Sequence, residues 1–188
     1  MLKKRDDFIQ SMLAHEENPA SLNDKKSKSL TNDEILSQAV AFLLAGYDTV
    51  FNALSFITYS LVTYPEHQQT LCEEIDTVLE KYDGEINYES VNEMKFMDMV
   101  IDETLRLYPA IIRLDREATS DYEYNGMKIK KGSLIAIPIY SLHYDPNTYP
   151  DPEKFDPYRF NDENKKTRDS ASYLPFGMGP RNCIGKYI

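Results

Sequence analysis

The sequence has few cysteines, few histidines and a deficit of positive charge, and each shortage excludes a class of protein. Two cysteines, Cys72 and Cys183, are too few for the disulfide framework of a small secreted domain. A Cys72–Cys183 disulfide is possible on count alone, but Cys72 falls within an expected helix. Three scattered histidines have no partner at metal-ligand spacing and are assigned no metal: His15, His67 and His143. The net charge of −10 argues against nucleic-acid binding, because phosphate backbones require a basic face.

The N-terminus has no long apolar run. Residues 1–7 are charged and no apolar segment follows them, so we expect no signal peptide or membrane anchor in this chain. Residues 16–30 are polar and are expected to form a loop, with the lysine cluster at 25–28 in solvent. The 188 residues, 41% of them hydrophobic and 28% charged, suit one globular domain with a sizeable core.

The apolar residues that are present follow helical spacing in the first half of the chain. A short helix is expected at residues 5–15. Thr31 and Glu34 have the spacing of a capping box, and they begin a long apolar-rich helix that should end near Thr63, before Tyr64-Pro65. We expect a buried core helix here in preference to a membrane span, because polar residues interrupt the apolar run: Gln38, Asp48 and Asn52.

Two shorter helices are expected to follow. The first starts at Pro65 and is closed by Gly84, with Glu73 and Glu74 on its solvated face. The second runs from Asp98 to Leu107 and ends at Tyr108-Pro109. Within it, residues Glu103 and Arg106 share a face that apolar residues surround, which indicates a paired and buried network or, alternatively, a weak surface ion pair.

The rest of the chain is expected to hold little regular structure. Residues 109–116 should be extended, and Asn125-Gly126 predicts a hairpin over 122–129. Residues 133–137 read as a buried strand, and residues 138–170 as an ordered series of turns. The fold class that we predict is mainly α with a small β component (α+β).

One cysteine near the end of the chain stands in an unusual loop, Phe176-Gly-Met-Gly-Pro-Arg-Asn-Cys-Ile-Gly185. Its glycines permit close backbone approach, and Pro180 stiffens the loop. Arg181 offers a permanent positive charge to an acidic group. Neighbouring N–H groups could hold Cys183 as the thiolate, which is the form that ligates metal. A small buried cysteine in an ordinary turn is the alternative at this point.

Nucleotide-binding loops do not fit this segment. A phosphate-binding loop ending at Gly185-Lys186 would need glycine where Pro180 stands and serine or threonine where Tyr187 stands. A dinucleotide loop that starts at Gly177 would need glycine in place of Asn182.

The loop resembles the haem-binding loop of the cytochrome P-450 family, Phe-x-x-Gly-x-Arg-x-Cys-x-Gly, with every fixed position filled. Three further segments are similar to family motifs in the family's order: Ala45–Val50, Glu103–Arg106 and Pro157–Phe160. Stretches such as AGYDT and MVIDETLRLYP point to the microsomal clan, which contains the liver drug-oxidising enzymes and thromboxane synthase. We therefore expect residues 1–188 to be the C-terminal part of that fold, a fragment with a long central helix and the haem-binding loop. The family's N-terminal half, and the helix after the cysteine loop, are expected to be missing.

The resemblance implies roles for individual residues. Cys183 would be the axial ligand of haem iron, with Phe176 covering the sulfur side. Arg181 and Arg116 would contact the haem propionates, and Ala45 would leave room over the iron. Asp48 and Thr49 would relay protons to bound dioxygen, with Thr49 bonding a carbonyl one turn back. The remaining implied residues line the substrate pocket or hold the core: Leu44, Ala45, Ala110, Ile111 and Ile112 for the pocket, and Glu103, Arg106 and Arg159 for the core.

Three positions depart from the family pattern or have no clear role in it. Val50 stands where threonine or serine is usual, and Tyr158 stands where the family has glutamate. The latter leaves the Glu103–Arg106 network one carboxylate poorer. Arg113 matches a family arginine whose role is not clear from the sequence.

The implied activity is mono-oxygenation of a lipophilic substrate by haem b, with electrons from NADPH through a separate flavoprotein reductase and with cytochrome b5 as a further partner. The implied location is the cytosolic face of the endoplasmic reticulum membrane. Two other interpretations stay open. The chain could be a truncated, inactive fragment or an interaction module, or it could be a thiolate-haem sensor or peroxidase-like protein.

Overall fold

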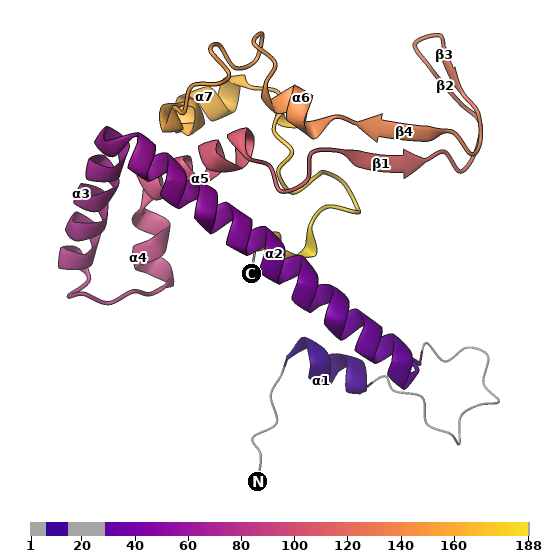
Figure 1. The fold of residues 1–188 in the computed structure, drawn as a ribbon, viewed down its shortest axis with the longest axis horizontal. Coiled ribbons are helices and arrows are strands. Elements are labelled where there is room, and N and C mark those ends of the chain that lie inside the picture. The colour runs from indigo at the N-terminus through magenta and orange to yellow at the C-terminus, as the bar shows by residue number, and fades with distance from the viewer. Residues whose placement is uncertain (1–6, 15–28, 188) are drawn as a thin grey trace. The chain divides into compact units, whose positions relative to one another are not determined.

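The computed structural model describes residues 7–14 and 29–187 (Figure 1). Two compact units divide the chain, residues 1–50 and residues 51–188, and each is described by itself. Most of the expected loop at 16–30, including the lysine cluster at 25–28, lies outside the described residues, as does His15.

The first unit holds a short helix and the start of a long one. Helix α1 (Phe8–Leu13) lies within the expected range and is capped by the Asp7 side chain, which accepts a hydrogen bond from the N–H of Gln10 at 2.9 Å. Helix α2 (Asn32–Thr63) begins with the predicted capping box. The N–H of Glu34 donates to Thr31 Oγ1 at 3.2 Å, and the N–H of Thr31 donates to Glu34 Oε2 at 2.9 Å.

The second unit is built on three further helices, α3 (Pro65–Lys81), α4 (Tyr88–Glu93) and α5 (Lys95–Leu107). As predicted, Gly84 closes α3: its N–H donates to Leu79 O at 2.8 Å and its φ is 81°. Helix α5 starts three residues earlier than predicted. The core of this unit is a cluster of five apolar residues from α3, α5 and a later loop: Leu71, Phe96, Val100, Leu107 and Phe155.

The expectation that α2 is a buried core helix is wrong for most of its length in this structure. In its second-unit part, Ile57 and Leu61 pack on the core cluster, but Leu54 is 59% exposed and Val62 is 70% exposed. Apolar side chains that are more than half exposed occur along the helix from Leu36 to Val62. Among the described helices it is the only one long and apolar enough to cross a membrane, a test that core helices of soluble proteins also pass.

Two small antiparallel sheets follow α5. Strand β1 (Leu114–Glu117) pairs with β4 (Leu134–Ile137), and β2 (Tyr122–Tyr124) pairs with β3 (Met127–Ile129). Asn125 and Gly126 have φ values of 49° and 79°, so the predicted hairpin is confirmed. The strand expected at 133–137 is present as β4, but the expectation that it is buried is wrong. Leu134 is 69% exposed, because the pair β1–β4 has a single layer and little packs on its outer face.

The stretch 138–170, expected to consist of turns, contains short helical segments. These are α6 (Ile139–His143), η2 (Pro157–Phe160), α7 (Asp162–Thr167) and the first residue of η3 (Ser170–Ser172). The turn-forming residues act here as helix caps: Asp156 accepts from the N–H of Tyr158, and Asn161 accepts from the N–H of Asn164. A last segment, η4 (Ile184–Tyr187), follows the cysteine loop.

Candidate functional site

The loop Phe176–Gly185 folds back on itself and presents Cys183 to solvent. The N–H of Cys183 donates to Phe176 O at 2.8 Å, and the N–H of Asn182 donates to Gly179 O at 3.1 Å. Gly177 and Gly179 have φ values of 71° and 82°, which side chains rarely tolerate. Cys183 and Cys72 are both free and exposed, so no disulfide joins them. The loop thus holds a single accessible thiol in a fixed backbone.

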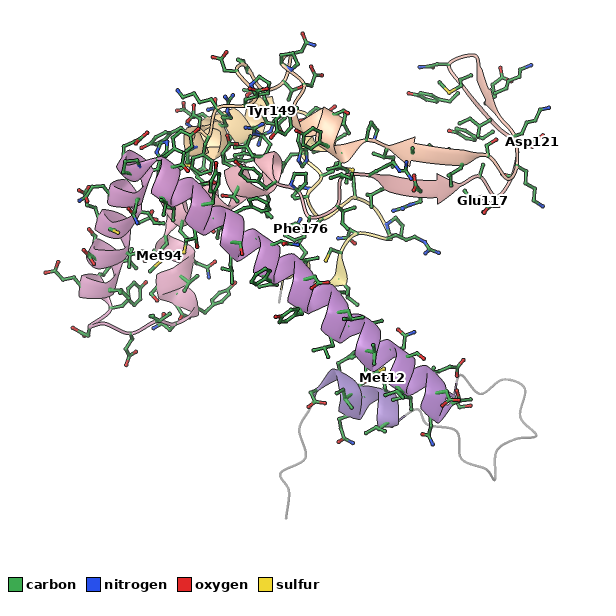
Figure 2. All side chains as sticks on the ribbon, in the orientation of Figure 1. Met12, Met94, Glu117, Asp121, Tyr149 and Phe176 are labelled. Atoms are coloured by element: carbon green, nitrogen blue, oxygen red, sulfur yellow. The ribbon has the colours of Figure 1, made fainter. Side chains whose placement is uncertain are left out.

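Strand β1 lies beside this loop. A Cβ atom at Gly177 would approach the side-chain atom Leu114 Cδ1 to 3.3 Å, so the tip of that side chain would have to shift by a few tenths of an ångström. Leu114 and Arg116 are two residues apart on β1, and their side chains therefore share one face. That face is the one on which the loop lies. Arg116 is half-buried and Arg181 is exposed. Phe176, labelled in Figure 2, is half-buried at the start of the loop.

Glu103 and Arg106 form a buried ion pair on α5. Both side chains are fully buried, and two parallel bonds of 2.7 and 2.8 Å join the guanidinium to the carboxylate. Arg106 also donates to His143 O at 2.9 Å and to Lys154 O at 3.3 Å. Burial raises the pKa of Glu103, and the hydrogen bonds and charge of Arg106 oppose that shift. The pair therefore ties α5 to α6 and to the loop before η2.

Arg159 joins this network loosely. Its Nε lies 3.5 Å from Glu103 Oε1, in a geometry that is not a hydrogen bond, and its Nη2 donates to Asp151 O at 3.0 Å. Glu103 Oε1 already accepts a hydrogen bond from Arg106 Nη2, and its second hydrogen bond comes from the N–H of Asp156 at 2.9 Å. Tyr158, which replaces the family glutamate, turns its ring to Phe96 at 5.5 Å between centroids. The network thus contains one carboxylate among the described residues.

His143 is a member of this region that sequence reasoning did not assign. It is fully buried, with Nδ1 3.2 Å from Arg106 O and Nε2 2.9 Å from the N–H of Leu174. Its partners are 37 and 31 residues away in sequence, so no local spacing could have indicated them. Burial lowers the pKa of His143 to about 4.

In the first unit, Leu44, Ala45, Asp48 and Thr49 lie on successive turns of α2. Thr49 Oγ1 donates to Ala45 O at 2.6 Å, which is the expected bond one turn back. Thr58 and Thr63 make the same bond, so it is not specific to this position.

Gly46, between Ala45 and Asp48, is more informative. Glycine inside a helix costs about 1 kcal/mol relative to alanine. A Cβ added at Gly46 would meet no atom within 4 Å in the described chain. Close helix packing, the structural explanation for a glycine here, is therefore not seen.

Ala110, Ile111 and Ile112 line one open hollow of about 510 Å³, together with Arg113 and Asp115. Arg113 and Asp115 form an exposed ion pair at 3.0 Å. The structure thus brings together the three second-unit residues implied for a substrate wall, and it gives Arg113 a partner on the rim.

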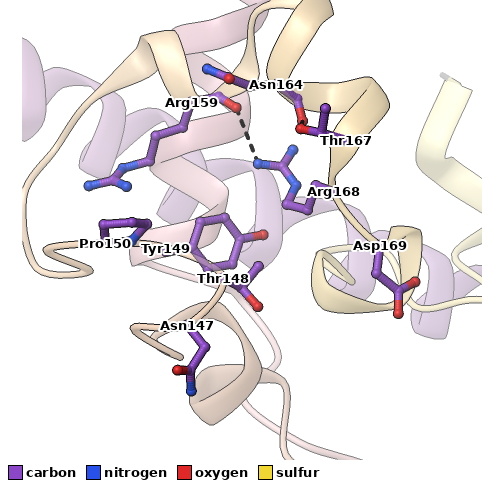
Figure 3. A pocket seen from close by; sticks show the side chains of 9 residues that line it. All are labelled: Asn147, Thr148, Tyr149, Pro150, Arg159, Asn164, Thr167, Arg168 and Asp169. Carbon is purple, nitrogen blue, oxygen red and sulfur yellow. Dashed lines mark hydrogen bonds between the residues drawn. The ribbon is translucent and has the colours of Figure 1, made fainter.

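A second hollow, of about 370 Å³, lies among the turns after α6 (Figure 3). Arg168 donates from Nη1 to Arg159 O at 3.2 Å, and its guanidinium lies over the Phe160 ring at 4.3 Å. Tyr149 and Tyr173 flank the same guanidinium at 5.3 and 5.7 Å. Its bonding and stacking partners are protein groups, so this hollow is part of the packing of the turns.

The donor set of the cysteine loop fits a haem. A Cys thiolate at an open face can hold haem iron, and the Cys183 thiol is exposed, with Gly185 at a position where a Cβ atom would lie 3.9 Å from the sulfur. Haem propionates need cations, and Arg181 is exposed two residues from the thiol. Arg116, on the strand face beside the loop, offers a second cation.

Comparison with known proteins agrees with this donor set. The sequence model of the family described as "Cytochrome P450" matches residues 2–188. The chain is 48% identical over 183 residues to cytochrome P-450 3A2 of Rattus norvegicus, 46% over 183 residues to cytochrome P-450 3A31 of Mesocricetus auratus, and 45% over 183 residues to cytochrome P-450 3A7 of Homo sapiens. Each match covers 97% of this chain and 36% of the relative, so the chain spans about a third of the length of these relatives. The chain belongs to the cytochrome P-450 family.

Proposed function

We propose that the protein represented by this chain is a haem-thiolate mono-oxygenase that acts on lipophilic organic substrates. The observation that carries the proposal is the exposed Cys183 thiol in a glycine-shaped loop with Arg181 beside it. When bound, a thiolate-ligated haem b supplies the reductive activation of dioxygen, so that one oxygen atom enters a C–H bond and the other leaves as water.

Three side chains of the second unit would hold the cofactor. Cys183 binds the iron as the thiolate, and the bond from its N–H to Phe176 O fixes the backbone that carries the sulfur. Arg181 and Arg116 would pair with the haem propionates. The Glu103–Arg106 pair, with Arg159 at its edge, holds α5 and the following loop in place and does not touch substrate.

Asp48 and Thr49 would deliver protons from the first unit. The Thr49 hydroxyl donates to Ala45 O, so its lone pairs are left to accept a hydrogen bond; to pass a proton on, the hydroxyl would turn from Ala45 O toward the acceptor while a lone pair takes the next proton. Asp48, as the carboxylic acid, would resupply the proton.

The substrate wall would be apolar. The family resemblance implies Leu44 and Ala45 for it, which lie on α2, and Ala110, Ile111 and Ile112, which line the hollow after α5. Such a wall selects lipophilic molecules without specifying one.

The electrons would come from NADPH through a separate flavoprotein reductase, with cytochrome b5 as a further donor. The given 188 residues contain no dinucleotide fingerprint, which is consistent with a separate reductase. We place the protein at the endoplasmic reticulum membrane, facing the cytosol, on its similarity to the microsomal clan.

The test is the reduced carbon-monoxide adduct of the full-length protein. We expect a thiolate-type Soret band that Cys183→Ser abolishes, with Cys72→Ser as the matched control that keeps it. A band that survives Cys183→Ser would refute the ligand assignment.

For the proton path, Thr49→Ala should lower product formed per NADPH consumed and raise peroxide release. Thr58→Ala, which removes the same type of helix bond, should change neither.

A further inference from the structure

We propose that His143 is a positioning residue that couples the buried Glu103–Arg106 pair to the base of the cysteine loop. This inference rests on the proposed function, since it concerns how the haem-ligating thiol is held.

His143 and Arg106 are bonded to each other twice. Arg106 Nη1 donates to the backbone oxygen of His143 at 2.9 Å, and the His143 ring Nδ1 lies 3.2 Å from the backbone oxygen of Arg106. The His143 side chain is fully buried, and its ring lies against Tyr173 at 5.3 Å between centroids. The ion pair on α5 therefore fixes both the backbone and the ring of this residue.

The partners of the ring define its tautomer. The N–H of Leu174 donates to Nε2 at 2.9 Å, so Nε2 carries no hydrogen. The neutral ring then has its hydrogen on Nδ1, from which it donates to Arg106 O. Burial favours this neutral form, because it lowers the pKa of His143.

Leu174 in turn lies two residues before the cysteine loop and is bonded to it. The oxygen of Leu174 accepts from the N–H of Gly177 at 3.1 Å, and the oxygen of Phe176 accepts from the N–H of Cys183 at 2.8 Å. A continuous line of hydrogen bonds thus runs from Arg106 through His143 and Leu174 to the loop that carries the thiol. An apolar ring at position 143 would leave a buried N–H and a buried carbonyl without their partners.

The experiment compares variants of the full-length, haem-loaded protein. His143→Phe keeps the ring volume and removes both nitrogens, and His143→Gln keeps a donor and an acceptor. The measurement is the rate at which the thiolate-type Soret band of the reduced carbon-monoxide adduct is lost in mild denaturant. We expect the rate to rise at least tenfold in His143→Phe and to rise much less in His143→Gln.

A core variant separates positioning from general stability. Val100→Ala truncates a fully buried apolar side chain on α5. This side chain takes no part in the hydrogen bonds that run from Arg106 to the cysteine loop. At denaturant concentrations that match the global stability of the two variants, Val100→Ala should keep the band longer than His143→Phe. Equal rates, an unchanged rate in His143→Phe, or loss in His143→Gln as fast as in His143→Phe would each overturn the inference.

Amide hydrogen exchange in the unsubstituted protein tests the same bond without a variant. The N–H of Leu174 should be protected in the haem-loaded protein, and exchange at the rate of an unstructured amide would contradict the proposal even if no variant folds. If the unsubstituted protein shows no thiolate-type band, the proposed function itself fails. If it shows the band and His143→Phe behaves as the parent, only the positioning role fails.

Discussion

Arg106 carries a positive charge on a side chain that is fully buried. Such a charge is tolerated only when a counter-ion and hydrogen bonds replace its hydration. Glu103 supplies the counter-ion, and the backbone oxygens of His143 and Lys154 occupy remaining donors. Glu103 is satisfied in the same way by Arg106 and the N–H of Asp156. His143 lies in α6, and Lys154 and Asp156 lie in the loop before η2. The buried pair therefore joins α5, α6 and that loop.

Removing one partner of this pair should be costly. We expect Arg106→Leu to reduce the free energy of unfolding of the full-length protein by about 3–5 kcal/mol, because it removes the doubly bonded counter-ion of the buried Glu103 carboxylate and leaves only the more distant Arg159, whose Nε lies at 3.5 Å. Arg106→Lys keeps the charge but loses the parallel bonds, and should give an intermediate loss. Denaturant titration measures both.

Lys81→Ala is the control for this comparison. It breaks the ion pair with Glu93, whose side chains are largely exposed, and little change in stability is expected. A loss in Arg106→Leu no greater than the loss in Lys81→Ala would contradict the prediction.

At the scale of elements, α5 shows what could and could not be predicted. Its C-terminal end before Pro109 followed from local chemistry, and the spacing of Glu103 and Arg106 indicated a shared face. Its start was predicted at residue 98, three residues late, since no capping side chain marks Lys95 in sequence. The cap comes from α3: Glu74 accepts from the N–H groups of Phe96 and Met97 at 2.7 and 2.9 Å.

The expectation that Glu74 lies on the solvated face of α3 is therefore wrong. A carboxylate at a helix N-terminus satisfies two unpaired N–H groups and complements the helix dipole. We expect Glu74→Ala to destabilise the protein by about 0.5–2 kcal/mol, the usual range for a lost cap. Glu74→Gln keeps one acceptor and should lose less.

Glu80→Ala, an exposed position on the same helix, is the matched control and should be close to neutral. The stability of the three variants is compared by thermal unfolding, followed by far-ultraviolet circular dichroism. Equal shifts for Glu74→Ala and Glu80→Ala would show that the bonds to α5 contribute nothing.

At the scale of the whole molecule, local patterns predicted the helices, the hairpin and the family motifs, and tertiary contacts account for what was missed. The capping box at Thr31 and the Asn125-Gly126 turn depend on residues a few positions apart, and both are present. The bonds of His143 and Glu74 join segments at least 22 residues apart, and no pattern in one sequence encodes such pairs. Burial of α2 was overestimated because apolar composition shows what a helix could bury but does not show what covers it.

That exposed helix carries the last prediction. The side chains of Leu54 and Val62 are more than half exposed on α2, and exposed apolar surface drives association in water. The 188-residue chain, expressed by itself, should therefore self-associate at micromolar concentration and bind a hydrophobic dye. Leu54→Glu and Val62→Glu should each reduce both the association and the dye binding without loss of the helical circular dichroism signal.

Gln68→Glu adds the same charge at an exposed polar position on α3 and is the control. If Gln68→Glu reduces association as much as Val62→Glu, net charge and not apolar surface is the cause, because added like charge alone also opposes association.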